Sequence, residues 1–117
     1  MPISKLAEAV EETRADIDSE GLTGPILGHV GDGNYHSTLL VDPGNEDHLK
    51  KAKALAGRMA ERALKLGGTV TGEHGVGIGK MDLLEQEHGE ATRVMAEIKR
   101  SLDPSNLMNP GKVVRLN

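Results

Sequence analysis

The stretch that decides the fold is Gly28-His29-Val30-Gly31-Asp32-Gly33-Asn34-Tyr35-His36. An extended apolar run, residues 26–30, leads into it, and a second extended run, residues 35–41, leaves it. The Gly-Asp-Gly-Asn segment between them predicts a turn that pairs the two runs as strands and brings His29 and His36 close together. Glycines at the end of an apolar segment also let the backbone approach a ligand closely, so we expect a binding site here.

A second glycine-rich stretch has the same character: Thr71-Gly72-Glu73-His74-Gly75-Val76-Gly77-Ile78-Gly79-Lys80. The β-branched run at residues 69–71 predicts a third strand that leads into it. Neither stretch has the glycine spacing of a phosphate-binding loop or of a dinucleotide-binding fingerprint. The two stretches therefore offer four site residues of another kind: His29, His36, Glu73 and His74.

The composition is that of one small soluble domain with a single core. Tyr35 is the only aromatic residue among 117, so we expect a thin aliphatic core and association with itself or another subunit. The formal net charge is −4 and no basic stripe is present, so nucleic-acid binding is excluded. The absence of cysteine excludes disulfides and thiolate metal sites. No apolar run approaches the roughly 20 residues that span a bilayer, and the start does not resemble a signal peptide.

Helical periodicity predicts four helices. The first has Ser4 as its N-cap and ends at Gly21, and the second follows Asn45 and ends at Gly67-Gly68. The apolar stripe of the second helix is expected at Leu49, Ala52, Ala56, Met59, Ala60, Ala63 and Leu66. The third is expected to start at an Asp82 cap and to end at Gly89, and the fourth to end at Asp103-Pro104.

The predicted order of elements is helix, strand, strand, helix, strand, helix, helix, which indicates an α+β fold. A right-handed crossover would join the second and third strands through the long helix. Three strands are about the minimum for an independent sheet, so we expect the remaining strands in absent sequence or in a partner subunit.

The first chemical interpretation of the site residues is a metal centre. His29, His36 and Glu73 form a set of two histidines and one carboxylate, which suits a catalytic zinc ion or a related divalent cation. Spacing alone also allows ordinary surface or turn histidines. His74 is the candidate general base because an imidazole accepts a proton near neutral pH, and the alternative is a loop histidine satisfied by backbone.

The other polar residues near these stretches have simpler explanations. Asp32 and Asn34 are expected to shape the turn by hydrogen bonds between side chain and backbone. His48 and His88 lie at helix ends, where capping and the helix dipole account for them.

The same segments resemble a known family, the FAD-linked 2-hydroxy acid dehydrogenases. Residues 28–36 resemble its His-x-Gly-Asp-Gly-Asn-x-His motif, residues 71–77 its Gly-Glu-His-Gly motif, and residues 103–112 its C-terminal signature. Within that family the sequence most resembles the D-lactate dehydrogenases of the cytochrome type, followed by the glycolate oxidase D subunit and D-2-hydroxyglutarate dehydrogenase.

The resemblance implies that residues 1–117 are the C-terminal segment of the substrate (cap) domain, with the FAD-binding domain absent. The implied fold is a partial ferredoxin-like α+β domain with a small antiparallel sheet, a long packed helix and a C-terminal helical piece.

The resemblance also assigns roles to residues. It implies that His29, His36 and Glu73 hold a divalent metal, zinc or manganese, and that His74 is the catalytic base. Residues implied to lie near substrate or flavin are Asn34, Thr38, Asn109 and Lys112, the last two in a tail that returns toward the flavin domain. Relatives that use dicarboxylates carry asparagine where this chain has Thr38, which favours lactate as substrate.

The implied activity is oxidation of a D-2-hydroxy acid to the 2-oxo acid, with hydride transfer to FAD and electrons passed to cytochrome c or a quinone. The implied partner is an FAD-binding domain or subunit, without which the chain alone is expected to be inactive. The expected location is cytoplasmic or on the mitochondrial matrix side, soluble or peripherally attached to a membrane. The alternatives are a metal-binding module without activity, and a structural fragment whose site is dead.

Overall fold

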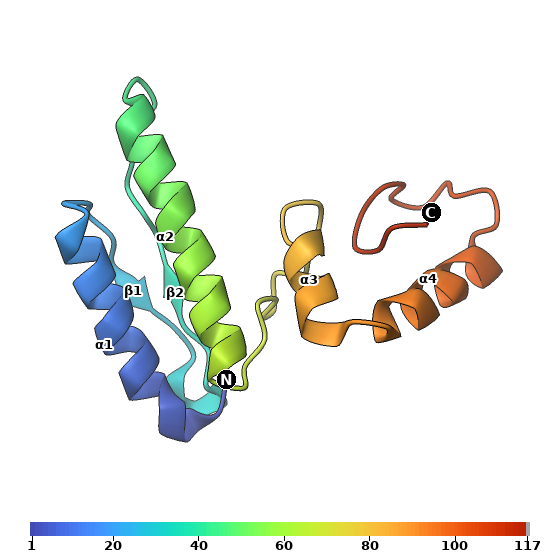
Figure 1. The fold of residues 1–117 in the computed structure, drawn as a ribbon, viewed down its shortest axis with the longest axis horizontal. Coiled ribbons are helices and arrows are strands. Elements are labelled where there is room, and N and C mark those ends of the chain that lie inside the picture. Colours follow the sequence, from blue (N-terminus) through green and yellow to red (C-terminus); the bar gives the residue numbers. More distant parts are fainter. Residues whose placement is uncertain (117) are drawn as a thin grey trace. The chain divides into compact units, whose positions relative to one another are not determined.

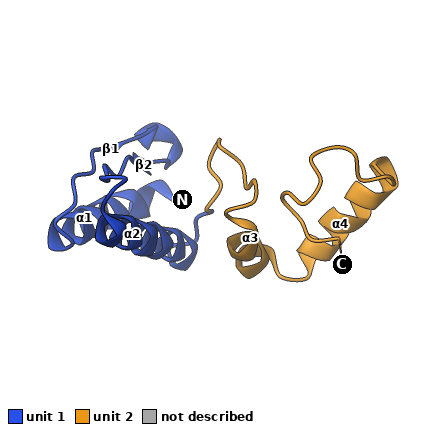
Figure 2. Ribbon diagram, turned by 90° about the horizontal axis from the view of Figure 1, so that it is seen from above, with its two compact units in different colours: residues 1–69 blue, residues 70–117 orange. Residues whose placement is uncertain are grey.

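The computed structural model describes residues 1–116. The chain divides into two compact units: unit 1, Met1–Thr69, and unit 2, which begins at Val70 (Figure 2). Each unit has its own hydrophobic cluster. The prediction of a single core is therefore wrong, because the apolar residues before and after the glycines of residues 67–79 pack locally within their own unit.

Unit 1 is built on two long helices that pack against each other, α1 (Ile3–Ser19) and α2 (Glu46–Lys65) (Figure 1). The core cluster joins α1 to α2 through Ile17, Leu22 and Leu55. Leu55 is fully buried, although the predicted stripe of α2 omitted it and included Ala56, which is exposed. The Asn45 cap is confirmed, since its side chain accepts hydrogen bonds from the backbone of the first turn.

In the segment of the chain that connects α1 to α2, two strands form the predicted antiparallel pair: β1 (Ile26–Leu27) and β2 (His36–Ser37). The register pairs Ile26 with Ser37 and Leu27 with His36. The extended run does not continue to Val30 as predicted, because residues Val30–Asp32 form a short 3₁₀ helix, η1. The carbonyl of His29 accepts hydrogen bonds from the backbone N–H groups of Asp32 and Asn34, which closes this turn.

Unit 2 contains two further helices, α3 (Met81–His88) and α4 (Ala91–Leu102). Leu84, Ala96 and Val114 form its core. Gly89 and Asp103 end the two helices as predicted.

Two predicted helix caps are wrong. Helix α1 begins at Ile3, two residues before the start that a Ser4 cap implies, and its N-cap is Pro2, whose ring fixes φ. Helix α3 begins after Lys80, so that Asp82 lies in its first turn and pairs with Arg115.

The predicted third strand at residues 69–71 does not form within the part of the chain that the structure describes. The backbone groups of Val70 bond to side chains instead of to a strand: its N–H donates to Glu87 Oε2 at 3.4 Å, and its carbonyl accepts from Lys80 Nζ at 2.6 Å. The predicted crossover between strands is wrong for the same reason.

The α+β class, the small antiparallel sheet, the long packed helix and the helical C-terminal piece are confirmed. Over residues 1–116, no helix has the length and apolar character needed to cross a membrane.

Candidate metal centre

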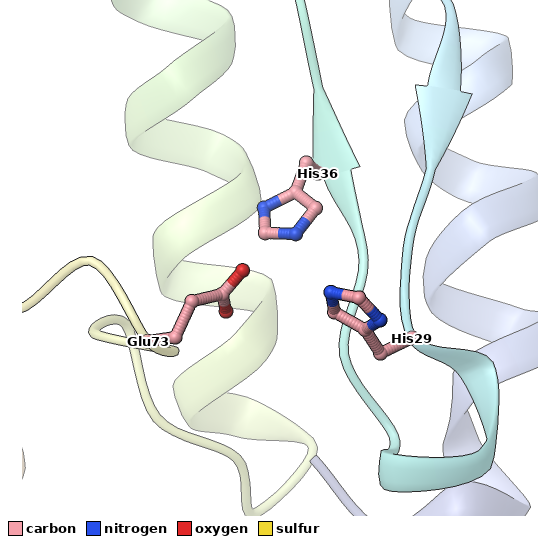
Figure 3. A group of neighbouring side chains, drawn as sticks. All are labelled: His29, His36 and Glu73. Carbon is pink, nitrogen blue, oxygen red and sulfur yellow. The ribbon is translucent and has the colours of Figure 1, made fainter.

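The antiparallel pair brings His29 and His36 together in unit 1. His36 is the first residue of β2 and pairs with Leu27, while His29 precedes η1. The two imidazole rings lie with their centroids 6.2 Å apart, nearly perpendicular to each other (Figure 3). The predicted proximity of these histidines is therefore confirmed.

This spacing fits a shared cation. A zinc ion bound about 2.0–2.1 Å from a histidine nitrogen lies about 3.2 Å from the ring centroid, so two tetrahedral ligands have centroids about 5 Å apart. The observed 6.2 Å exceeds that value by about 1 Å, which small side-chain rotations can remove. His29 is exposed and His36 half-buried, so the pair remains open to solvent on one side.

Glu73 and His74 lie in unit 2, in an exposed segment without regular secondary structure. The Nε2 atom of His74 is 3.5 Å from Oε1 of Glu73. Gly72 and Gly75, which flank the pair, both have positive φ, a conformation that only glycine adopts easily. The glycines therefore set the backbone path of this segment, and they leave both side chains accessible.

The segment that carries Glu73 and His74 is tied down at its ends. Lys80 Nζ donates to the carbonyl of Val70 and closes the loop. Farther along, the carbonyl of Gly77 accepts a hydrogen bond of 2.8 Å from the backbone of Val113. These contacts hold the loop to α3 and to the C-terminal tail of unit 2.

His29 and His36 of unit 1 and Glu73 of unit 2 each offer one atom that could bind a metal ion. Figure 3 draws these three side chains. They provide two imidazoles and one carboxylate, a donor set suited to zinc and to related divalent ions.

The remaining predicted site residues fall into both units. Asn34 and Thr38 flank β2 in unit 1. Asn109 and Lys112 lie in the tail after α4, where Lys112 Nζ donates to Asn109 Oδ1 at 3.2 Å. Asn109 has a positive φ, 48°, within a tight turn.

The sequence analysis missed a polar cluster that centres on the buried Thr13 and includes Tyr35, the residue before His36. Thr13 lies at an apolar position of α1, and its hydroxyl is 3.0 Å from the Tyr35 hydroxyl and accepts from Arg62. The only signal in the sequence was a threonine on the apolar face of a helix.

The fold and these residues define a class: an α+β segment with a histidine pair on a glycine-rich hairpin in unit 1 and a Gly-Glu-His-Gly loop in unit 2. Comparison with known proteins assigns the family. Residues 1–113 match the family described as "FAD linked oxidases, C-terminal domain", and the chain belongs to this family.

Similar proteins carry consistent names. The chain is 51% identical over 117 residues to a protein of Danio rerio named "Probable D-lactate dehydrogenase, mitochondrial", covering 99% of this chain and 24% of that protein. It is 44% identical over 115 residues to "D-lactate dehydrogenase [cytochrome], mitochondrial" of Arabidopsis thaliana, covering 97% of this chain and 20% of that protein. It is 38% identical over 112 residues to "Glycolate oxidase subunit GlcD" of Bacillus subtilis, covering 95% of this chain and 23% of that protein. The chain thus spans about a quarter or less of the relatives that it matches.

Proposed function

We propose that this chain supplies the metal- and substrate-binding part of an FAD-dependent dehydrogenase that oxidises D-lactate or a similar D-2-hydroxy acid to the 2-oxo acid. The observation that carries the proposal is the closeness of His29, which precedes η1, to His36, the first residue of β2. The similarity to proteins named D-lactate dehydrogenase supports the choice of substrate.

In this proposal His29, His36 and Glu73 bind one divalent cation, zinc or manganese. When bound, such an ion acts as a Lewis acid that makes the hydroxyl of the substrate easier to deprotonate. The accessible sides of the three residues leave room for the hydroxyl and carboxylate of the substrate.

His74 accepts the proton of the substrate hydroxyl. Its exposed imidazole is accessible to a substrate, and its Nε2 lies 3.5 Å from Oε1 of Glu73. Asn34 and Thr38 contact substrate from the histidine side. Thr38 stands where the relatives that use dicarboxylates carry asparagine, and this difference favours lactate over dicarboxylates.

The rest of the chemistry belongs to protein outside this chain. FAD, held by a flavin-binding domain or subunit, supplies the acceptor for the hydride, and cytochrome c or a quinone reoxidises it. In this proposal the chain is the C-terminal segment of the cap domain, and its tail with Asn109 and Lys112 faces the flavin domain. The protein is located in mitochondria or in the cytoplasm. The names of the mitochondrial relatives support that location.

The metal site is tested by titrating the 117-residue chain with Co²⁺ and Zn²⁺ under calorimetric and absorbance detection. We expect one ion per chain, and a loss of affinity of at least a hundredfold in His29→Ala, because removing a ligand costs more than disturbing a supporting residue. His48→Ala and His88→Ala are matched controls, since these histidines lie at helix ends in α2 and α3. Equal binding by wild type and His29→Ala refutes the site.

The base is tested in the enzyme that carries the flavin domain. His74→Ala should slow the reduction of bound FAD by D-lactate about 10²–10⁴-fold while leaving FAD bound. Flavin reduction at the wild-type rate would remove His74 from that role. The isolated chain should not reduce a dye with D-lactate, because no side chain accepts a hydride.

A further inference from the structure

The interior of unit 1 holds a polar contact at a place where packing predicts an apolar one. Thr13 is fully buried on the face of α1 that packs against the rest of the unit, alongside Leu6, Ala9 and Ile17. A hydroxyl in such a place is unfavourable unless it is hydrogen-bonded. The Thr13 hydroxyl is bonded twice, to Arg62 at 2.8 Å and to Tyr35 at 3.0 Å.

Arg62 of α2 is held in one orientation by two carboxylates of α1. Its Nε donates to Glu12 and its Nη2 to Asp16, both at 2.6 Å, while Nη1 donates to Thr13. Burial lowers the pKa of Arg62, but the hydrogen bonds that it donates to Asp16 and Glu12, together with their negative charges, outweigh burial and leave the pKa raised, so the guanidinium stays charged. A guanidinium has no acceptor, so Thr13 must accept from Arg62, and the orientation of its hydroxyl is thereby restricted.

Tyr35 extends this arrangement to the histidine pair. It is the residue immediately before His36, and its rigid ring carries the backbone of β2 to a fixed point on α1. On the other side of His36, the Ser37 hydroxyl is buried with no hydrogen-bond partner among the described residues. Of the two hydroxyls that flank His36, the Tyr35 hydroxyl is therefore the one that ties this part of the chain to α1, while the Ser37 backbone pairs with β1.

We propose that Thr13 and Arg62 are positioning residues: by holding the Tyr35 hydroxyl they fix the backbone before His36, and hence the spacing of the His29 and His36 rings. The inference rests on the proposed function only for its consequence, metal affinity. The positioning itself is a property of the metal-free chain.

Two single-oxygen deletions on either side of His36 give a matched test. Tyr35→Phe removes the hydroxyl that reaches Thr13, and Ser37→Ala removes the hydroxyl that has no partner. We expect Tyr35→Phe to weaken Co²⁺ binding about 10–100-fold, as for residues that orient metal ligands, and Ser37→Ala to leave it unchanged. Equal effects of the two substitutions refute the proposal.

Substitutions at Thr13 separate positioning from packing. Thr13→Ser keeps the hydroxyl and should bind Co²⁺ like wild type, whereas Thr13→Val keeps the shape and should lose affinity as Tyr35→Phe does. If the two hydroxyls act through one hydrogen bond, the double variant Thr13→Val/Tyr35→Phe should be no weaker than the weaker single variant. Full additivity of the two losses contradicts the coupling.

A readout without metal distinguishes failure of this inference from failure of the proposed function. In the metal-free chain, the nuclear Overhauser effect between the rings of His29 and His36 should be present in wild type and Ser37→Ala and lost or weakened in Tyr35→Phe. If His29→Ala leaves Co²⁺ affinity unchanged, the metal site is wrong, and this signal still decides the positioning. An unchanged ring-to-ring signal in Tyr35→Phe overturns the inference.

Discussion

Gly28 is the position in the histidine hairpin where a single methyl group should do most harm. A Cβ built on Gly28 would lie 2.3 Å from the carbonyl oxygen of Asn34 and 2.5 Å from Cα of Tyr35. Both neighbours are backbone, so the two arms of the turn must separate to admit the methyl group. Overpacking of this kind costs about 1–3 kcal/mol, and the lower entropy of the unfolded alanine chain returns about 0.4–1 kcal/mol. The net destabilisation expected for Gly28→Ala is therefore about 1–2 kcal/mol.

Gly31 provides the control within the same stretch. It lies in η1, and a Cβ added there meets nothing within 4 Å. Gly31→Ala should therefore be neutral or stabilise unit 1 by up to about 1 kcal/mol. The difference between the two variants isolates the collision at Gly28 from the general effect of replacing glycine.

The assay is urea unfolding followed by the fluorescence of Tyr35, which reports on unit 1 because it is the only aromatic residue. With a urea dependence of about 2 kcal/mol per molar, the midpoint of Gly28→Ala should fall by about 0.5–1 M. Co²⁺ affinity should fall as well, because the separation moves His29 from His36. A midpoint for Gly28→Ala equal to or above that of Gly31→Ala would refute this reasoning.

Two further predictions concern unit 2. Asp103 accepts hydrogen bonds from Lys99 and from the backbone of Leu107 and Met108, which lowers its pKa from 3.8 to about 2. Because the pKa is lower in the folded state, the stabilisation is complete above about pH 4 and is lost as the pH falls toward 2. In Asp103→Asn, the hydrogen-exchange protection of the Leu107 and Met108 amides should already be low at pH 5. Protection equal to that of the wild type at pH 5 would contradict this prediction. Ile98 is 55% exposed and lies in the middle of an apolar stripe on α4, so the isolated chain should self-associate. Ile98→Asp should make the chain monomeric, as measured by sedimentation velocity. A wild-type chain that stays monomeric at high concentration would show that the stripe does not drive association.

The features that the sequence predicted well are those set by residues close together in the chain. Asn45 caps α2 because its side chain reaches N–H groups two and three residues away, at 3.0 and 3.2 Å. The hairpin likewise follows from a turn whose hydrogen bonds stay within the His29–Asn34 segment. Such local rules gave the helix order, the antiparallel pair and the proximity of the two histidines.

The features that failed depend on partners distant in the sequence. Residues 69–71 have the β-branched composition of a strand, but a strand also needs a neighbour to pair with, and Glu87 and Lys80 bond to Val70 instead. The cap predicted at Ser4 is wrong for a different reason, since a shift of one or two residues at a helix end changes the energy very little.

The Thr13 cluster shows why candidate ligands can be read from a sequence more easily than the residues that support them. Histidine and glutamate side chains between glycines have few structural roles, so His29, His36 and Glu73 can be recognised as candidate ligands from the sequence alone. Thr13 is 22 residues from Tyr35 and 49 from Arg62, and at an apolar position of a helix it differs from a valine by one oxygen atom. That oxygen is tolerated in the interior only because an arginine fixed by two carboxylates donates to it. Retaining five hydrogen-bonded polar groups around a position where a valine would pack is costly for stability alone, and the proposed role in positioning His36 explains this cost.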